Sequence, residues 1–273
     1  MPSRRQFVRA ATAIAGAAAF PDPLLSAGDG PMPERIAEIP ASQPIRIGAL
    51  VFPRMDQVDL TGPYAVLSRL PNSTFRLLWK DSMPVRDYHG LGLIPDASLA
   101  DAGPVDLLVI PGGPGQEGLM EDEEVLAFIA ERAAAARCVF SVCTGALICG
   151  AAGLLKGRSA TTHWASFSFL KYFGAVPVDE RVVVDGTFVS AAGLTAGVDG
   201  ALRVASLLRG EEAAKAIQLE IQYAPEPPFD CGTPDRAPAA LVTRLMKAGE
   251  PLAERRLATA KRAAARLGVR VEG

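Results

Sequence analysis

The sequence predicts an α/β fold in which a mostly parallel sheet lies between two layers of helices, as a three-layer sandwich. Strand-like runs alternate along the chain with helical segments of about ten residues, the pattern of parallel strands joined by crossover helices. Two of the runs, 105–110 and 138–142, are almost entirely apolar, as expected of strands buried on both faces. The first of them opens directly into the glycine-rich loop PGGPG at 111–115, which is typical of the end of a buried strand.

The first half of this domain contains strands, one helix and a hairpin. A β-type run over 44–52 predicts the first strand, and apolar positions at helical spacing predict a helix over 60–70. Residues 74–80 are again strand-like. Residues 84–98, with glycine between two short apolar runs, predict a small hairpin that precedes the buried strand 105–110.

The second half continues the alternation. Residues 121–136 predict a helix whose acidic first turn complements the helix dipole, and the strand 138–142 leads into a helix over 144–155. Residues 159–163 predict the next strand. The remaining elements are a hairpin over 182–193 with Asp185-Gly186 at its turn, helices near 197–209 and 211–223, a proline-rich loop over 224–238 and a closing basic, alanine-rich helix.

Residues 1–27 predict a twin-arginine export signal. The pair Arg4-Arg5 stands in the pattern Ser-Arg-Arg-x-Phe, an alanine-rich stretch follows, and Leu25-Ser26-Ala27 has the small-residue pattern of a cleavage site. The alternative is a disordered, alanine-rich start with arginines present by chance. With the signal in use, the protein is periplasmic or otherwise exported and engages the twin-arginine translocation machinery; otherwise it is cytoplasmic.

Composition narrows the remaining possibilities. Residues 28–44, rich in proline and glycine, predict a linker into one domain over 45–273. The 273 residues carry a net charge of −2 and no lysine or arginine cluster, which argues against nucleic-acid binding. No apolar run reaches the ~20 residues of a membrane span. Two histidines and four cysteines lack metal-site spacing, so we expect no metal, and no disulfide framework is indicated.

Three candidate site elements follow predicted parallel strands, whose carboxyl ends meet at one edge of the sheet. They are Asp59, the loop 111–115 and Cys143. Cys143 would occupy a sharp strand-to-helix turn, a nucleophile elbow, where the helix N-terminus stabilises a thiolate. The alternative reading is a small apolar core residue, and this is the reading we adopt for Cys138 and Cys149.

The neighbours of Cys143 allow two interpretations each. Asp59 is either a helix N-cap or an acid/base group that bonds the thiolate. Gly112 and Gly113 either form an ordinary strand-exit turn or let backbone N–H groups approach a ligand, as in an oxyanion hole. His163, at the end of the strand predicted over 159–163, is either a base for Cys143 or a structural histidine; the residues alone favour the structural role.

Thr144 and Gly145 would be the first helical residues, with their N–H groups directed toward the thiol.

Six stretches together resemble the PfpI-like superfamily, which has the class I glutamine-amidotransferase-like, flavodoxin-like fold. They cover nearly everything from residue 45 onward. The stretches are VFPRMDQVDLTGPYAVLSRLP, IPGGPGQEGLMED, SVCTGALICGAAGLLKGRSATTHWA, VPVDERVVVDG, GLTAGVDGAL and QLEIQYAPEPPF…GTPDRAPA. Within the superfamily the resemblance is to the isonitrile hydratase branch, and it makes 45–273 a PfpI-like α/β domain.

The resemblance implies a homodimer, a small-molecule substrate and no metal or organic cofactor. It implies a cysteine-dependent hydro-lyase that adds water to an isonitrile, R–N≡C, and forms an N-substituted formamide. Cys143 would be the nucleophile, Asp59 the acid/base partner, and Thr144 would position water. Gly113 would face them, and His163 is similar to a family histidine near the nucleophile.

Other branches of the superfamily fit the motifs less well. PfpI-type peptidases carry histidine where this chain has Thr144, and glyoxalase and deglycase branches typically carry glutamate at the position of Asp59. AraC-type regulators share the pattern CTGA…ATTHW, but the closing helix here has no helix-turn-helix partner. Export would suit a different substrate, so the alternatives are a non-catalytic small-molecule or redox sensor, or a hydrolase or glyoxalase-type enzyme on another electrophile.

Overall fold

The computed structural model describes residues 35–271, so the export signal predicted over 1–27 lies outside the described residues. Its centre is a seven-stranded sheet in the order β10-β11-β7-β6-β1-β2-β5, in which only β10 and β11 pair antiparallel. The α/β fold and the mostly parallel sheet are therefore confirmed. The strands are β1 (Ile45–Leu50), β2 (Ser73–Trp79), β5 (Ala97–Ser98), β6 (Leu107–Ile110), β7 (Cys138–Val142), β10 (Val182–Asp185) and β11 (Phe188–Ala191).

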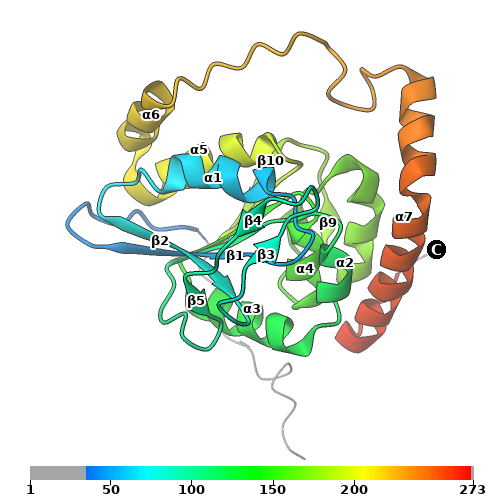
Figure 1. The fold of residues 1–273 in the computed structure, drawn as a ribbon, viewed down its shortest axis with the longest axis horizontal. Helices are drawn as coiled ribbons and strands as arrows, with labels where there is room; N and C mark the ends of the chain where they lie inside the picture. The colour runs from blue at the N-terminus through cyan, green and yellow to red at the C-terminus, as the bar shows by residue number, and fades with distance from the viewer. Residues whose placement is uncertain (1–34, 272–273) are drawn as a thin grey trace, which may run out of the picture.

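Helices cover the sheet on both faces, which gives the three layers (Figure 1). On one face, α1 (Val58–Leu67) packs against α5 (Ala196–Arg209), and α6 (Glu211–Glu220) packs beside α5. On the other face lie α3 (Glu123–Ala135) and α4 (Gly145–Ala151). The short α2 (Gln116–Leu119), the 3₁₀ segment η1 (Trp164–Phe173) and α7 (Ala239–Leu267) pack beside α4.

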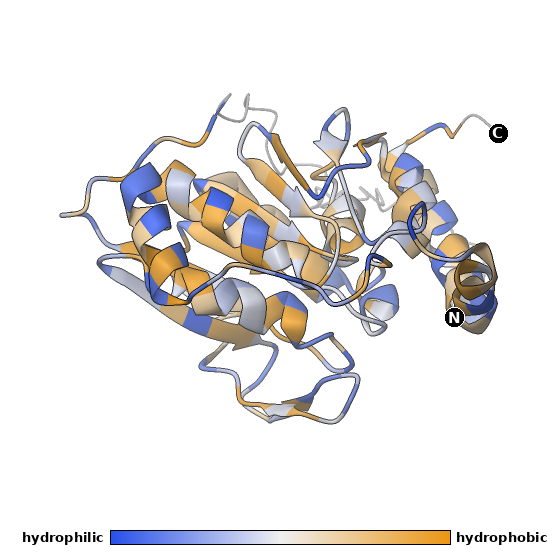
Figure 2. Cartoon of the chain, turned by 90° about the horizontal axis from the view of Figure 1, so that it is seen from above, coloured by the Kyte–Doolittle hydropathy of each residue, from blue (hydrophilic) through white to orange (hydrophobic). Residues whose placement is uncertain are grey.

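The central strands form the hydrophobic core. Every residue of β6 and β7 is buried, which explains why both runs are almost entirely apolar. The strands of the sheet are mostly hydrophobic, while the surface helices carry both hydrophobic and hydrophilic residues (Figure 2). Burial of the two strands fixes the positions of the loops at their carboxyl ends.

The hairpin predicted over 84–98 is shorter than expected. Only β3 (Val85–Arg86) and β4 (Gly92–Leu93) pair antiparallel, because Asp87 accepts hydrogen bonds from the N–H groups of His89 and Leu91 and closes the turn early. The chain then returns to the main sheet, where β5 forms a parallel edge strand next to β2.

The prediction of a strand of the main sheet over 159–163 is wrong in both the length and the position of the strand. Only β8 (Ser159–Ala160) forms, and it pairs with β9 (Val176–Pro177) in a separate two-stranded sheet. The N–H of Thr161 instead donates to the hydroxyl of Ser190, so side-chain bonding ends the strand. As a result, His163 does not lie at a strand end of the main sheet.

Residues 35–44, the described part of the predicted linker, are anchored to the domain. Ile36 and Ile39 are buried in the core. The guanidinium of Arg209 at the end of α5 donates hydrogen bonds of 2.6 Å to the carbonyl oxygens of Ile39 and Pro40 and of 2.5 Å to that of Gln43. A buried arginine thus replaces the strand partners that this segment lacks.

The chain between α6 and α7 leaves the body of the domain. Residues 224–230 are all exposed, and Figure 1 shows this loop arching from α6 to α7. The first turns of α7, at 243–250, are exposed on all sides, whereas Arg256, Thr259, Ala260, Ala263 and Ala264 are buried. No helix within residues 35–271 combines the length and the apolar character that crossing a bilayer requires.

Candidate active site

Cys143 lies in a strained turn between β7 and α4, as the sequence predicted. Its φ is +56°, a left-handed value that is rare for a residue with a side chain. The backbone is held on both sides: the Cys143 N–H donates to the carbonyl of Ala191 at 2.9 Å, and its carbonyl accepts from the hydroxyl of Thr162 at 2.7 Å. Strain that the surroundings enforce in this way is characteristic of functional positions.

Gly145 makes the turn sterically possible. A Cβ atom at this position would overlap the carbonyl oxygen of Ile110 at the end of β6. Only glycine therefore lets the first turn of α4 pack directly against the end of the neighbouring strand. This close approach brings Cys143 beside the loop that follows β6.

Asp59 is the second residue of α1, and the N-cap interpretation is wrong. The N-cap position is Gln57, whose side chain makes no cap hydrogen bond. The Asp59 side chain is completely buried, and its Oδ2 accepts a hydrogen bond of 3.1 Å from the N–H of Gly112. Its Oδ1 has no hydrogen-bond partner among residues 35–271. A buried carboxyl oxygen without a partner is costly, which indicates a chemical role.

The loop after β6 holds the neighbouring side chains in place. The Gly113 N–H donates to the hydroxyl of Thr144 at 3.0 Å, and that hydroxyl lies 3.3 Å from the Gly113 carbonyl oxygen. Gly113 has a φ of +117°, and a Cβ atom there would overlap the backbone of Asp56 and Met55. The N–H groups of Gly112 and Gly113 are thus engaged by Asp59 and Thr144. In this structure they position the acid and the hydroxyl rather than standing free as oxyanion donors.

Burial and mutual charge determine the protonation of Asp59 and Cys143. Burial, followed by the negative charge of Asp56, raises the pKa of Asp59 to about 7, although Cys143 and the N–H groups of Gly112 and Leu194 oppose the rise. Burial, followed by the charge of Asp59, also raises the pKa of Cys143 well above that of a free thiol. The N–H of Thr144 lowers it, as expected at a helix N-terminus, but burial outweighs this contribution. The pair therefore holds at least one proton near neutral pH.

His163 is the N-cap residue of η1. Its Nδ1 accepts a hydrogen bond of 3.3 Å from the N–H of Ala165, so the ring caps this segment. Burial and the nearby charge of Arg256 lower the pKa of His163, which leaves its imidazole neutral. No hydrogen bond within residues 35–271 joins it to Cys143. The geometry thus matches the structural role that the residues alone favoured.

Arg256 is a site residue that the sequence analysis missed. It comes from α7, and its guanidinium donates to Gln116 Oε1 at 2.8 Å, to Ser166 Oγ at 3.1 Å and to the carbonyl oxygen of Gly113 at 3.4 Å. Its positive charge lowers the pKa of Cys143, against the larger effects of burial and of Asp59. The spacing of the buried positions 256, 259, 260 and 263 marks the inward face of this helix and could have revealed it.

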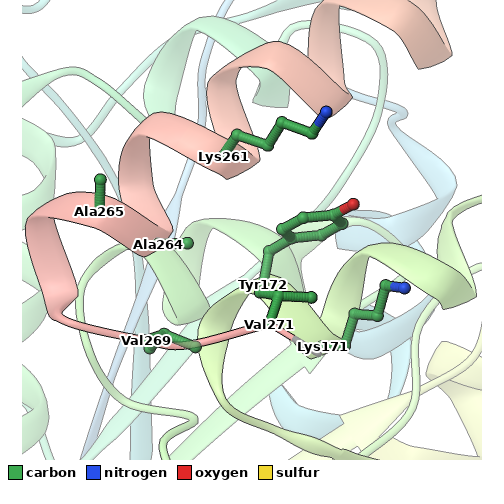
Figure 3. Close-up of a pocket in the computed structure, with 7 residues that line it drawn as sticks. All are labelled: Lys171, Tyr172, Lys261, Ala264, Ala265, Val269 and Val271. Carbon is green, nitrogen blue, oxygen red and sulfur yellow. The ribbon is translucent and has the colours of Figure 1, made fainter. Parts of the chain in front are cut away.

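No group of three or more histidine, cysteine, aspartate or glutamate side chains within residues 35–271 is placed to hold a metal ion. A surface pocket of about 480 Å³ lies between η1 and the end of α7 (Figure 3). Two lysines and a tyrosine surround its alanine and valine floor, and none of the candidate site residues lines it. The pocket is therefore separate from the constellation around Cys143.

Comparison with known proteins agrees with this geometry. The sequence model of the DJ-1/PfpI family matches residues 45–207, which is more than half of the chain. The match includes Asp59 and Cys143. The chain belongs to the DJ-1/PfpI family. The resemblance inferred from the motifs is confirmed, and family membership accounts for the mostly parallel sheet with helices on both faces.

Individual members of the DJ-1/PfpI family place the chain more narrowly. It is 49% identical over 226 residues to the isonitrile hydratase of Pseudomonas putida, a match that covers 83% of this chain and 99% of the relative. A ThiJ/PfpI family protein from Pseudomonas syringae superposes with a TM-score of 0.79 at 37% identity, covering 81% of this chain and 93% of the other. Protein DJ-1alpha of Drosophila melanogaster is 28% identical over 54% of this chain and 70% of its own.

Proposed function

We propose that this DJ-1/PfpI protein is a cysteine-dependent isonitrile hydratase, a lyase that adds water to R–N≡C and releases an N-substituted formamide. The observation that carries the proposal is the buried pair of Asp59 and Cys143 at a strained elbow. The identity of 49% with an isonitrile hydratase over nearly the whole relative supports it. A small, largely apolar isonitrile also suits a site whose nucleophile is only 5% exposed.

In the first half of the proposed reaction, the Cys143 sulfur forms a bond to the terminal carbon of the isonitrile. The thiol proton passes to Asp59, which returns it to that carbon, so the product is a thioimidate, Cys–S–CH=N–R. A carboxyl with a pKa of about 7 can accept and return a proton at neutral pH without a large driving force.

In the second half, water attacks the thioimidate carbon. Asp59 takes a proton from the water as the C–O bond forms and delivers it to the nitrogen, which gives Cys–S–CH(OH)–NH–R. The C–S bond then breaks, the hydroxyl proton passes through Asp59 to the Cys143 sulfur, and the formamide R–NH–CHO leaves. The Thr144 hydroxyl, fixed by Gly113 beside the thiol, is placed to orient the water.

The direct experiment is the conversion of cyclohexyl isocyanide to N-cyclohexylformamide by the reduced protein. We expect formamide from the parent and from Cys231→Ser, a matched control in the exposed loop region. We expect none from Cys143→Ala or Asp59→Asn. A folded, reduced parent that forms no formamide refutes the isonitrile assignment and leaves a non-catalytic sensor as the alternative.

We infer that the protein works as a homodimer, with the arm formed by the loop 224–238 and the start of α7 as the contact. Phe229, Leu245 and Met246 are 77%, 49% and 46% exposed there, although such side chains are normally buried. Sedimentation should give twice the chain mass, and Leu245→Glu with Met246→Glu should shift it toward the monomer. A parent that sediments as a monomer at assay concentration contradicts this part of the proposal.

We propose that residues 1–27 direct export through the twin-arginine pathway. The test is fractionation of cells expressing the full chain. The protein should reach the periplasm, and replacing Arg4 and Arg5 with lysine should retain it inside the cell. Equal retention of both forms would show that the segment is not used for export.

A further inference from the structure

Arg256 carries a buried positive charge that has no role in the proposed reaction steps. Its side chain is 9% exposed, and its hydrogen bonds go to an amide oxygen, a hydroxyl and a backbone carbonyl, none of them ionised. It forms no ion pair with a carboxylate of residues 35–271. A buried guanidinium whose partners are all neutral is destabilising, because neutral acceptors do not replace its hydration.

Three separate elements hold the guanidinium in place. Gln116 comes from α2 and Ser166 from η1, and both are completely buried. The carbonyl of Gly113 belongs to the loop that also binds Thr144. Arg256 is therefore fixed against the same loop that positions the residues around Cys143, although it reaches the site from the far end of the chain.

From this geometry we propose that Arg256 is a positioning residue whose fixed charge stabilises the Cys143 thiolate as it forms. The thiol is buried beside a carboxylate, and both features disfavour the sulfur anion. A permanent cation nearby compensates for them, because a guanidinium keeps its proton throughout the working pH range. The proposal rests on the proposed role of Cys143 and adds the charge that this role requires.

The other charged groups around the site cannot provide this stabilisation. Asp59 from α1 and Asp56 from the loop before it are acidic, and His163 at the start of η1 is neutral. Glu117 of α2 is acidic and is bonded to the hydroxyl of Thr259 at 2.9 Å. Arg255, the neighbour of Arg256 on α7, is directed toward Glu117, with 3.9 Å between Nε and Oε2.

The experiment measures the alkylation of Cys143 by iodoacetamide between pH 6 and pH 10, with peptide mass spectrometry as the readout. The background is Cys231→Ser, since Cys138 and Cys149 are fully buried. Arg256→Gln should raise the apparent pKa of the thiol by one unit or more and slow alkylation at pH 7.5 about tenfold. Arg256→Lys, which keeps the charge, should stay within about threefold of the parent at pH 7.5, well inside that tenfold change.

Two controls separate this charge effect from loss of structure. Arg262→Gln removes an exposed arginine from the same helix, one that pairs with Glu121, and should leave the alkylation profile unchanged. Arg256→Met, an apolar replacement of similar length, substitutes for Arg256→Gln if that variant does not fold. If the uncharged variant follows the parent profile, or Arg256→Lys loses as much rate as the uncharged variant, the proposal is overturned.

Isonitrile turnover by the same protein variants, before alkylation, is measured separately. Normal alkylation with no formamide refutes the substrate assignment and leaves the role of Arg256 standing.

Discussion

The carboxylate of Asp59 accepts a hydrogen bond of 3.1 Å from the N–H of Gly112, and this contact joins the start of α1 to the loop after β6. It occupies Oδ2, and Oδ1 has no hydrogen-bond partner within residues 35–271. The free oxygen is therefore the one available to the Cys143 thiol. The contact orients the carboxyl, whereas burial and the charge of Asp56 raise its pKa to about 7 against the opposing effect of this hydrogen bond.

The first prediction concerns the stability of Asp59→Asn as pH changes. The pKa of Asp59 is about 7 in the folded protein, against 3.8 for an unperturbed carboxyl, so the folded state binds this proton more tightly. The parent should lose stability as pH rises from about 4 to 7, by at most about 4 kcal/mol. Asn pays no such penalty and still accepts the bond from Gly112. The free energy of unfolding, measured in urea, should therefore favour Asp59→Asn over the parent more strongly at pH 8 than at pH 5. If the two proteins differ by the same free energy at both pH values, the raised pKa is contradicted.

The second prediction concerns the Thr144 hydroxyl. Thr144→Val keeps the shape of the side chain but removes the partner of the Gly113 N–H, which is buried. We expect a loss of stability of about 1–3 kcal/mol and a fall in turnover of about tenfold or more, because the loop and the bound water lose their orientation. Thr144→Ser retains the hydroxyl and should recover most of both. The measurements are formamide formation and urea unfolding, and equal turnover by the valine and serine variants would show that the hydroxyl has no part in the reaction.

Local sequence patterns were sufficient to predict the sheet and the elbow. The runs at 105–110 and 138–142 are apolar because β6 and β7 are buried on both faces, a property that each run displays by itself. The turn at Cys143 then follows, since a buried strand passes directly into a helix. For the same reason, Cys138 and Cys149 could be assigned to the core, where both are fully buried.

Features that depend on distant partners were not predictable in this way. The short β8 could not be placed, because its pairing with β9 and the bond from Thr161 to Ser190 are tertiary contacts. Arg256 lies in a helix whose basic, alanine-rich composition indicates an exposed surface. The spacing of positions 256, 259, 260 and 263 marks an inward face, but only the packing against α2 and η1 shows which groups the buried arginine contacts.

The third prediction compares Gly113, in the loop after β6, with Gly118 in α2. Gly113→Ala must place a Cβ atom against the backbone of Asp56 and Met55 with φ at +117°, so something must shift. We expect the free energy of unfolding to fall by several kcal/mol, roughly the sum of the costs of overpacking and of backbone strain, and we expect turnover to be lost. Gly118→Ala is the control, because among residues 35–271 no atom beyond its chain neighbours and its own helix backbone lies within 4 Å of the new Cβ, and because it sits in α2. Its stability should match or exceed that of the parent, by up to about 1 kcal/mol. The measurement is thermal unfolding of both variants. Equal melting temperatures would contradict the close contact between Gly113 and the backbone of Asp56 and Met55.

The fourth prediction concerns the contact that supports the strained elbow. The Thr162 hydroxyl donates to the Cys143 carbonyl at 2.7 Å, and both groups are buried. Thr162→Val removes this donor and leaves the buried carbonyl only the 3.5 Å hydrogen bond from the N–H of Ala146, which should cost about 1–3 kcal/mol in the free energy of unfolding. Because the left-handed φ of Cys143 is itself unfavourable, part of that strain should relax by movement of the thiol, and turnover should fall more than substrate affinity.

Thr162→Ser keeps the donor and is the matched control for this prediction. It should hold kcat close to that of the parent, while Thr162→Val lowers kcat with little change in KM, since the hydroxyl contacts the backbone of the elbow. A valine variant with parental kcat would mean that the elbow is maintained without Thr162, because the Cys143 N–H still donates to the carbonyl of Ala191 at 2.9 Å. A rise in KM at constant kcat would instead assign Thr162 to substrate binding. It would contradict the prediction that Thr162 supports the turn at Cys143.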